Sequence, residues 1–239
     1  MPLIFIILIV VIVVAAGIGF AVLEHQHLKS RRRREMAGWA EANGLKFRPD
    51  HDYSIGFRYQ PFQWLQEGDN RYAYNIMVGT SGQWVTCGFD YHYQIHPANG
   101  KGLRRTHHHH FSAVVVDAGF PLKPLFIRPG RLFDKVAEFV GFEGLGFESA
   151  EFSRKFCVKS PDRRWAYDVL HQKTLEMMLD YPRFHIDIHG TQVAACSGHI
   201  EFTPEEFALA LKLVTGILDN LPDAVVRELK GIDCGGVLS

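Results

Sequence analysis

The N-terminal 23 residues constrain this chain more than any other part, because they include a long apolar stretch. Leu3 to Leu23 contains no charged residue. As an α-helix this stretch would measure about 31 Å, close to the thickness of a bilayer's hydrocarbon core, about 30 Å. A helix also satisfies its own backbone hydrogen bonds in lipid. The sequence therefore predicts one N-terminal transmembrane helix.

The residues on either side of this stretch distinguish an anchor from a cleaved signal peptide. A signal peptide has basic residues before an apolar core of about 7–15 residues. Here the stretch is longer, and the basic residues follow it: Lys29, Arg31, Arg32, Arg33 and Arg34. The positive-inside rule then predicts a retained single-pass anchor in the cell (inner) membrane, with the N-terminus outside and the following domain in the cytoplasm.

The basic cluster after the anchor has two interpretations. It acts only as the topology signal, or it also binds anionic membrane headgroups, at about 1 kcal/mol per basic residue. Either way, the chain divides into an anchor over residues 1–24, a basic juxtamembrane linker over 25–34, a soluble domain over 35–232 and a tail over 233–239.

Hydrophobic patterns in the soluble domain favour strands that come in pairs. One β-hairpin is predicted from residues 71–79 and 83–93, around Ser81-Gly82, and a second from residues 183–189 and 191–197, around Gly190. Helical patterns separate these pairs, and the last helix opens with a capping box at Thr203. Hairpins with helices between them predict an α+β fold with a mainly antiparallel sheet and packed helices.

An internal similarity suggests two pseudo-repeated halves. At an offset of 100, four positions of the segment 35–47 match the segment 135–147: Ala37, Gly44, Leu45 and Phe47 match Ala137, Gly144, Leu145 and Phe147. A duplicated helix-plus-hairpin unit would explain this. The alternative is two unrelated helices that end at the same glycine stop signal.

Several motifs together resemble a family of uncharacterised bacterial membrane proteins. They are Phe89-Asp90-Tyr91-His92-Tyr93 on a strand, Ile127-Arg128-Pro129 before a helix, and Phe147-Glu148-Ser149 followed by Glu151-Phe152 and Phe156, behind a membrane helix and a basic run. The resemblance covers most of the soluble domain. It implies a membrane-anchored protein with a cytosolic domain. It supplies no catalytic residues, because no activity is assigned to the family.

Composition and motifs exclude several classes of protein. The 26 basic residues are balanced by 26 acidic ones, which argues against a nucleic-acid partner. No phosphate-binding loop, nucleophile elbow or zinc-protease motif is present. We therefore expect no catalytic residue of a known motif and no cofactor.

The 13 histidines are unusual and suggest a metal site as an alternative. His185, Asp187 and His189 alternate along a predicted strand, so they share one sheet face, and His108 and His110 form a similar pair. Imidazole and carboxylate groups in such rows ligate zinc and related ions. The simpler interpretation, which we favour, is the solvated face of a half-buried strand.

Asp90 is also unusual, because it lies between Phe89 and Tyr91 on an aromatic strand. A carboxylate there is a candidate catalytic acid with a raised pKa. We favour a structural role, in which Asp90 accepts hydrogen bonds, for example from Arg128.

These patterns favour a non-enzymatic, membrane-tethered module that binds a protein or another ligand. One alternative is a metal-dependent enzyme or metal sensor, which clustering of His185, Asp187 and His189 with other histidines would support. The other is a membrane-surface lipid-binding domain, which a deep apolar pocket near the membrane end would support.

Overall fold

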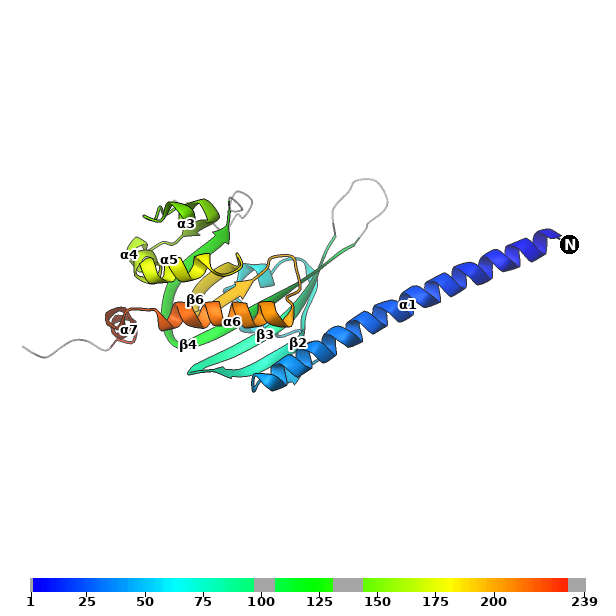
Figure 1. Ribbon diagram of the computed structural model, residues 1–239, viewed down its shortest axis with the longest axis horizontal. Helices are drawn as coiled ribbons and strands as arrows, with labels where there is room; N and C mark the ends of the chain where they lie inside the picture. Colours follow the sequence, from blue (N-terminus) through cyan, green and yellow to red (C-terminus); the bar gives the residue numbers. More distant parts are fainter. Residues whose placement is uncertain (1, 97–105, 131–143, 232–239) are drawn as a thin grey trace, which may run out of the picture.

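The computed structural model describes residues 2–96, 106–130 and 144–231. They form a six-stranded, wholly antiparallel sheet, with the longer helices packed on one face and one long helix leaving the domain (Figure 1). The predicted α+β fold with a mainly antiparallel sheet is therefore confirmed.

Helix α1 (Pro2–Ala42) runs without a break through the basic cluster. Its last turns pack on the domain, where Met36 and Ala40 are fully buried, while the rest extends away from the sheet (Figure 1). The helix stops at Gly44, which has φ +68°. Glycine adopts this left-handed conformation at little cost, so it ends the helix as predicted.

The transmembrane prediction gains no support from the structure. Within the part of the chain that the structure describes, no helix is both long and apolar enough to cross a membrane. The assignment of residues 3–23 therefore stays a prediction from the sequence. The predicted domain boundaries are also untested, and the tail over 233–239 lies outside the described residues.

The sheet is organised around β4, a strand of 23 residues. The strand order in the sheet is β1-β2-β3-β4-β5, and β6 also pairs with β4. The strands are β1 (Lys46–Arg48), β2 (Asp69–Ser81), β3 (Trp84–Ile95), β4 (His107–Pro129), β5 (Phe156–Lys159) and β6 (His185–Cys196). The hairpin of β2 and β3 turns at Gly82, which has φ +59°, so the first predicted hairpin is confirmed.

The second predicted hairpin, around Gly190, is wrong. Strand β6 continues through Gly190 and pairs with β4 on both sides of it. Gly190 has φ +63° beside an irregularity in the β4–β6 register. A glycine with positive φ fits a bulge as well as a turn, so the local sequence did not distinguish the two.

This correction leaves the duplication unconfirmed. The hairpin that would match β2–β3 is missing among the described residues, because β6 is one strand that pairs with β4 on both sides of Gly190. The helix that the duplication predicts before Gly144 lies outside the described residues.

The sheet buries both of its faces. One face packs against α1 and the C-terminal helices, and its core includes Phe207, Val214 and Trp165. The other face is covered by the segment of α2 and η1, and its core includes Phe62 and Phe89. The remaining helices are α2 (Ile55–Arg58), η1 (Gln63–Leu65), α3 (Ala150–Lys155), α4 (Arg163–Val169), α5 (Gln172–Leu179), α6 (Pro204–Asp219) and α7 (Asp223–Leu229). The capping box predicted at Thr203 opens α6.

Candidate functional site

A pocket of about 760 Å³ lies where α1 leaves the sheet. We call this pocket the α1 pocket. One wall is the basic turn of α1, and the others come from the start of β2, the end of β3 and the start of β4. Its lining residues are Leu28, Lys29, Arg32, Arg33, His51, Asn70, Tyr72, Tyr74, Asn75, His92, Gln94, His108, His110 and Glu201.

Two β-bulges in β2 shape this pocket. The β2–β3 register shifts between Asp69 and Tyr72, and again between Tyr74 and Met77. Each shift contains an asparagine with φ +49°, Asn70 in the first and Asn75 in the second. Asparagine tolerates the left-handed region better than most residues, and bulges redirect side chains beside sites. Both asparagines line the pocket, so the irregular part of β2 is the part that forms it.

Stacked rings form the floor of the α1 pocket. The His51 and Tyr72 rings stack with centroids 4.1 Å apart, and the Tyr72 and His92 rings stack with centroids 4.5 Å apart. The ring of His110 is tilted by 54° to that of His92, with centroids 4.8 Å apart. His92 Nε2 also lies 3.0 Å from His108 Nδ1. A floor of ring faces with polar edges can hold a flat or amphiphilic group by stacking and by hydrogen bonds.

Glu201 closes the edge of this floor. The Tyr74 hydroxyl donates to the Glu201 carboxylate and lies 2.9 Å from His110 Nδ1. Since the single hydroxyl hydrogen is used on Glu201, the His110 nitrogen must be the donor in the second bond. Burial, reinforced by the carboxylates of Asp90 and Glu201, raises the pKa of Tyr74, so this hydroxyl stays protonated.

A buried ion pair lies under the pocket. Asp90 is fully buried, and Arg32 of α1 reaches it through Nε at 3.0 Å and Nη2 at 2.6 Å. Asn75 and Ser112 donate to the same carboxylate at 2.8 and 2.6 Å. These contacts support the structural role favoured for Asp90. The partner suggested for it, Arg128, is wrong, because Arg128 lies far along β4 from Ser112, the residue opposite Asp90.

The burial of these groups shifts their protonation. Burial raises the pKa of Asp90 although Arg32, Ser112 and Asn75 act in the opposite direction. Burial alone would lower the pKa of Arg32, but its hydrogen bonds and attraction to Asp90 raise the pKa overall. For His92 and His110, burial lowers the pKa, and neighbouring histidines add to the effect. The imidazoles of His92 and His110 therefore favour the neutral form at neutral pH.

The residues proposed as metal ligands are divided between two places. His108 and His110 line the α1 pocket. Asp187 is only 3% exposed and is held by Arg128 and by Trp64 Nε1 at 2.8 Å. Among the described residues, no group of three or more His, Cys, Asp or Glu side chains is arranged to hold a metal ion.

The two histidines beside Asp187 are both partly buried. Burial lowers the pKa of His185 to about 4, and the charge of Arg128 adds to this shift. His189 Nδ1 is buried and has no hydrogen-bond partner within the described part of the chain.

The structure also divides the five basic residues predicted to meet headgroups. Lys29, Arg32 and Arg33 line the α1 pocket, and Arg32 is committed to Asp90. Arg31 pairs with Glu35 on the exposed side of the helix, and Arg34 is exposed outside the pocket lining.

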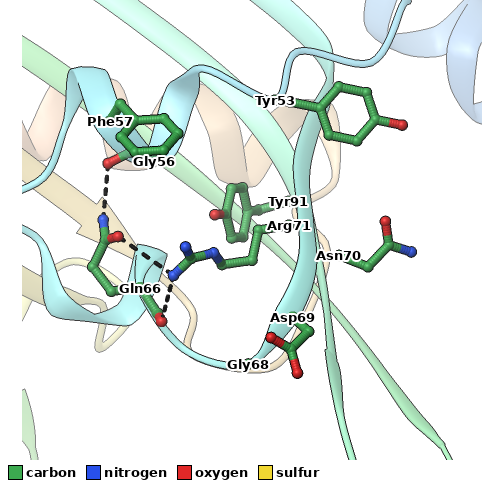
Figure 2. A pocket seen from close by; sticks show the side chains of 9 residues that line it. All are labelled: Tyr53, Gly56, Phe57, Gln66, Gly68, Asp69, Asn70, Arg71 and Tyr91. Atoms are coloured by element: carbon green, nitrogen blue, oxygen red, sulfur yellow. Dashed lines mark hydrogen bonds between the residues drawn. The ribbon is translucent and has the colours of Figure 1, made fainter.

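A second, smaller pocket of about 230 Å³ lies on the other face of the sheet, beside α2. Figure 2 shows the Arg71 guanidinium directed at Gln66. Arg71 Nη1 donates to the Gln66 backbone oxygen at 2.6 Å, and Gln66 Nε2 donates to Gly56 O at 2.8 Å. Since the cation is already held and the space is small, this pocket is the weaker candidate.

Comparisons with known proteins show the fold. No family model matches the chain, and no curated protein is similar to it in sequence. The crystal structure of the mycobacterial trehalose monomycolate transport factor A, TtfA, is similar with a TM-score of 0.55 and 11% identity. The match covers 80% of this chain and 96% of that chain. At this identity the chain shares an architecture with TtfA, and nothing about its ligands follows from the match.

Proposed function

We propose that this chain is a membrane-tethered, non-enzymatic binding module that holds an amphiphilic ligand in the α1 pocket. The observation that carries the proposal is the pocket itself, which combines stacked rings, further histidine side chains and the basic turn of α1. Its volume lies within the range of about 300–1,000 Å³ that is typical of small-molecule sites.

The tether is part of the proposal and rests on the sequence. The uncharged stretch from Leu3 to Leu23 and the basic residues after it support a single-pass anchor with the domain in the cytoplasm. The resemblance to bacterial membrane-anchored proteins has the same implication. Tethering raises the local concentration of a membrane ligand, so a modest intrinsic affinity suffices.

The comparison with TtfA is compatible with a binding or transport-associated role. TtfA is, by its name, a trehalose monomycolate transport factor, and the two chains share an architecture. We extend only the general idea of a non-enzymatic carrier or adaptor to this chain. A protein partner stays open under this proposal, and a nucleic acid is not expected because the charge is balanced.

The metal-dependent alternative receives no specific support. The carboxylate of its candidate set, Asp187, is engaged by Arg128 and Trp64. The histidines of the α1 pocket are engaged with one another and with Tyr74. A lipid-binding role, in contrast, agrees with the position of the pocket at the base of the proposed anchor.

The proposal can be tested on the full chain purified in a mild detergent. The chain is exposed to a total lipid extract of its expression host, and the lipids that stay bound are counted by native mass spectrometry. We expect close to one retained lipid per chain.

Gln94→Trp should remove this lipid, because Gln94 lines the pocket and the larger side chain fills it. Gln83→Trp makes the same change in the β2–β3 turn, at the other end of the hairpin, and should have no effect. A wild-type chain that retains no lipid, or a Gln94→Trp variant that retains as much as the wild type, would refute the proposal.

A further inference from the structure

We infer that the α1 pocket selects an anionic lipid headgroup that carries a phosphate, held between Lys29 and Arg33. This inference rests on the proposed function and names the class of its ligand.

The charge balance at the wall favours an anion. Arg32 is neutralised by Asp90, which is buried beneath it. Lys29 and Arg33 are exposed at the pocket and form no ion pair with any described residue. The opposing carboxylate, Glu201, accepts the Tyr74 hydroxyl and lies 3.7 Å from Arg32, so part of its charge is already compensated. Two cations without an ion pair to a described residue, Lys29 and Arg33, therefore face one carboxylate, Glu201, whose charge is partly compensated.

The floor of the pocket adds no negative charge. Burial lowers the pKa of His92 and of His110, which favours the neutral imidazole. The one donor of each neutral ring is already used, because His110 Nδ1 donates to the Tyr74 hydroxyl and His92 Nδ1 donates to Asn70 O. The donors that a phosphate needs are therefore the charged side chains of Lys29 and Arg33. The site suits a phosphate held by these two cations over uncharged ring faces.

The position of the pocket along α1 favours a lipid over free phosphate. Leu28 and Arg33 follow Leu23, the last residue of the uncharged stretch, by 5 and 10 residues. At 1.5 Å per residue this is about 8–15 Å along the helix axis. With residues 3–23 in a bilayer core, the pocket would lie where the headgroup layer meets water.

One apolar side chain of α1 lies at the pocket. Leu28 is exposed and lines the pocket on the side of the uncharged stretch. An acyl chain can contact Leu28 while the headgroup occupies the pocket. A free phosphate ion would use only the two cations.

The test measures the thermal shift of the full chain in detergent with three probes at equal concentration. They are dihexanoyl phosphatidic acid, dihexanoyl phosphatidylcholine and inorganic phosphate. We expect the phosphatidic acid to stabilise the chain in a saturable way. Its apparent affinity should be about tenfold or more higher than that of the other two probes, because only this probe joins a phosphate monoester to acyl chains.

Two double variants on the same helix separate the pocket from general charge. Lys29→Gln/Arg33→Gln should weaken binding of the phosphatidic acid at least about tenfold. Arg31→Gln/Arg34→Gln removes the same charge outside the pocket and should change it less than about twofold.

Each other outcome has a defined meaning. Equal stabilisation by inorganic phosphate overturns the lipid headgroup as the source. Equal stabilisation by the phosphatidylcholine, lost in Gln94→Trp, overturns the anionic class but leaves the proposed binding function intact. Equal weakening by both double variants, or no stabilisation by any probe, overturns the inference, and the retained-lipid measurement then decides separately whether the pocket binds lipid at all.

Discussion

Two buried arginine–aspartate pairs serve different regions of this molecule. Asp187 and Arg128 join β6 to β4 and are covered by Trp64, so both side chains are almost fully enclosed. Asp90 and Arg32 join β3 to α1 beneath an open pocket, and Arg32 keeps 21% of its side chain exposed. The closed pair ties two strands of one sheet together. The open pair fixes the helix that carries the candidate site, so the same chemistry serves stability in one region and positioning in the other.

The largest expected effect comes from breaking the closed pair. Arg128→Met should lower the free energy of unfolding by about 3–5 kcal/mol, because Asp187 would stay buried without its cation. Denaturant unfolding of the full chain in detergent measures this. Arg164→Met is the control, since the Arg164 side chain is 78% exposed in its ion pairs with described residues, and the substitution should lower the free energy of unfolding by less than about 0.5 kcal/mol. A small effect at Arg128 would mean that water reaches Asp187.

A pH titration sharpens the comparison, because His185 lies beside the closed pair. Its pKa is lowered to about 4 by burial and by Arg128. The unfolded chain, with a histidine pKa of about 6.5, therefore binds the proton first as the pH falls. Stability should be lost between pH 6.5 and 4, by up to about 3 kcal/mol.

The variant His185→Gln should remove this part of the pH dependence. His27→Gln, at an exposed position on α1, should leave it unchanged. An unchanged slope in His185→Gln would show that His185 is accessible to solvent in the folded chain.

Breaking the open pair of Arg32 and Asp90 should lower the free energy of unfolding less than breaking the closed pair of Arg128 and Asp187. In Arg32→Met, Asp90 still receives hydrogen bonds from Asn75 and Ser112, so we expect a loss of about 2 kcal/mol. The docking of α1 should loosen at the same time, which proteolysis near Glu35 would detect. If Arg32→Met costs as much as Arg128→Met, the distinction between the two pairs fails.

The smallest effect is expected at the second bulge. Asn75→Ala should cost about 1–2 kcal/mol, because it places alanine at φ +49° and removes a donor to Asp90. Asn75→Gly keeps the conformation and removes only the donor, so it should cost about half as much. Unfolding midpoints compare the two variants directly. Equal losses would indicate that the bulge conformation contributes nothing.

The sequence predicted the local elements better than their connections. The β2–β3 hairpin and the capping box of α6 were predictable because their signals, Ser81-Gly82 and Thr203, lie within the elements themselves. Gly190 was misassigned because a bulge and a turn require the same positive φ. The difference depends on whether β4 offers a partner on both sides, and this long-range pairing is not encoded near Gly190.

The candidate site was predicted only in part, for a related reason. The basic residues on α1 and the pair His108 and His110 were identified from local patterns. Tyr72, Tyr74 and Glu201 were missed, since they join these residues only through the register of three strands and a loop after β6. The alternation of Tyr72 and Tyr74 was the one available signal, because two aromatic residues two apart share a strand face.

Photo-cross-linking in native membranes tests the central claim most directly. Benzoylphenylalanine is placed at Gln94, in the α1 pocket, and separately at Gln83, in the distant β2–β3 turn, and adducts are identified by mass spectrometry. The account predicts a lipid adduct at position 94 that is absent at position 83. No lipid adduct at position 94, or equal lipid adducts at both positions, would contradict the assignment of the α1 pocket as a lipid-binding site.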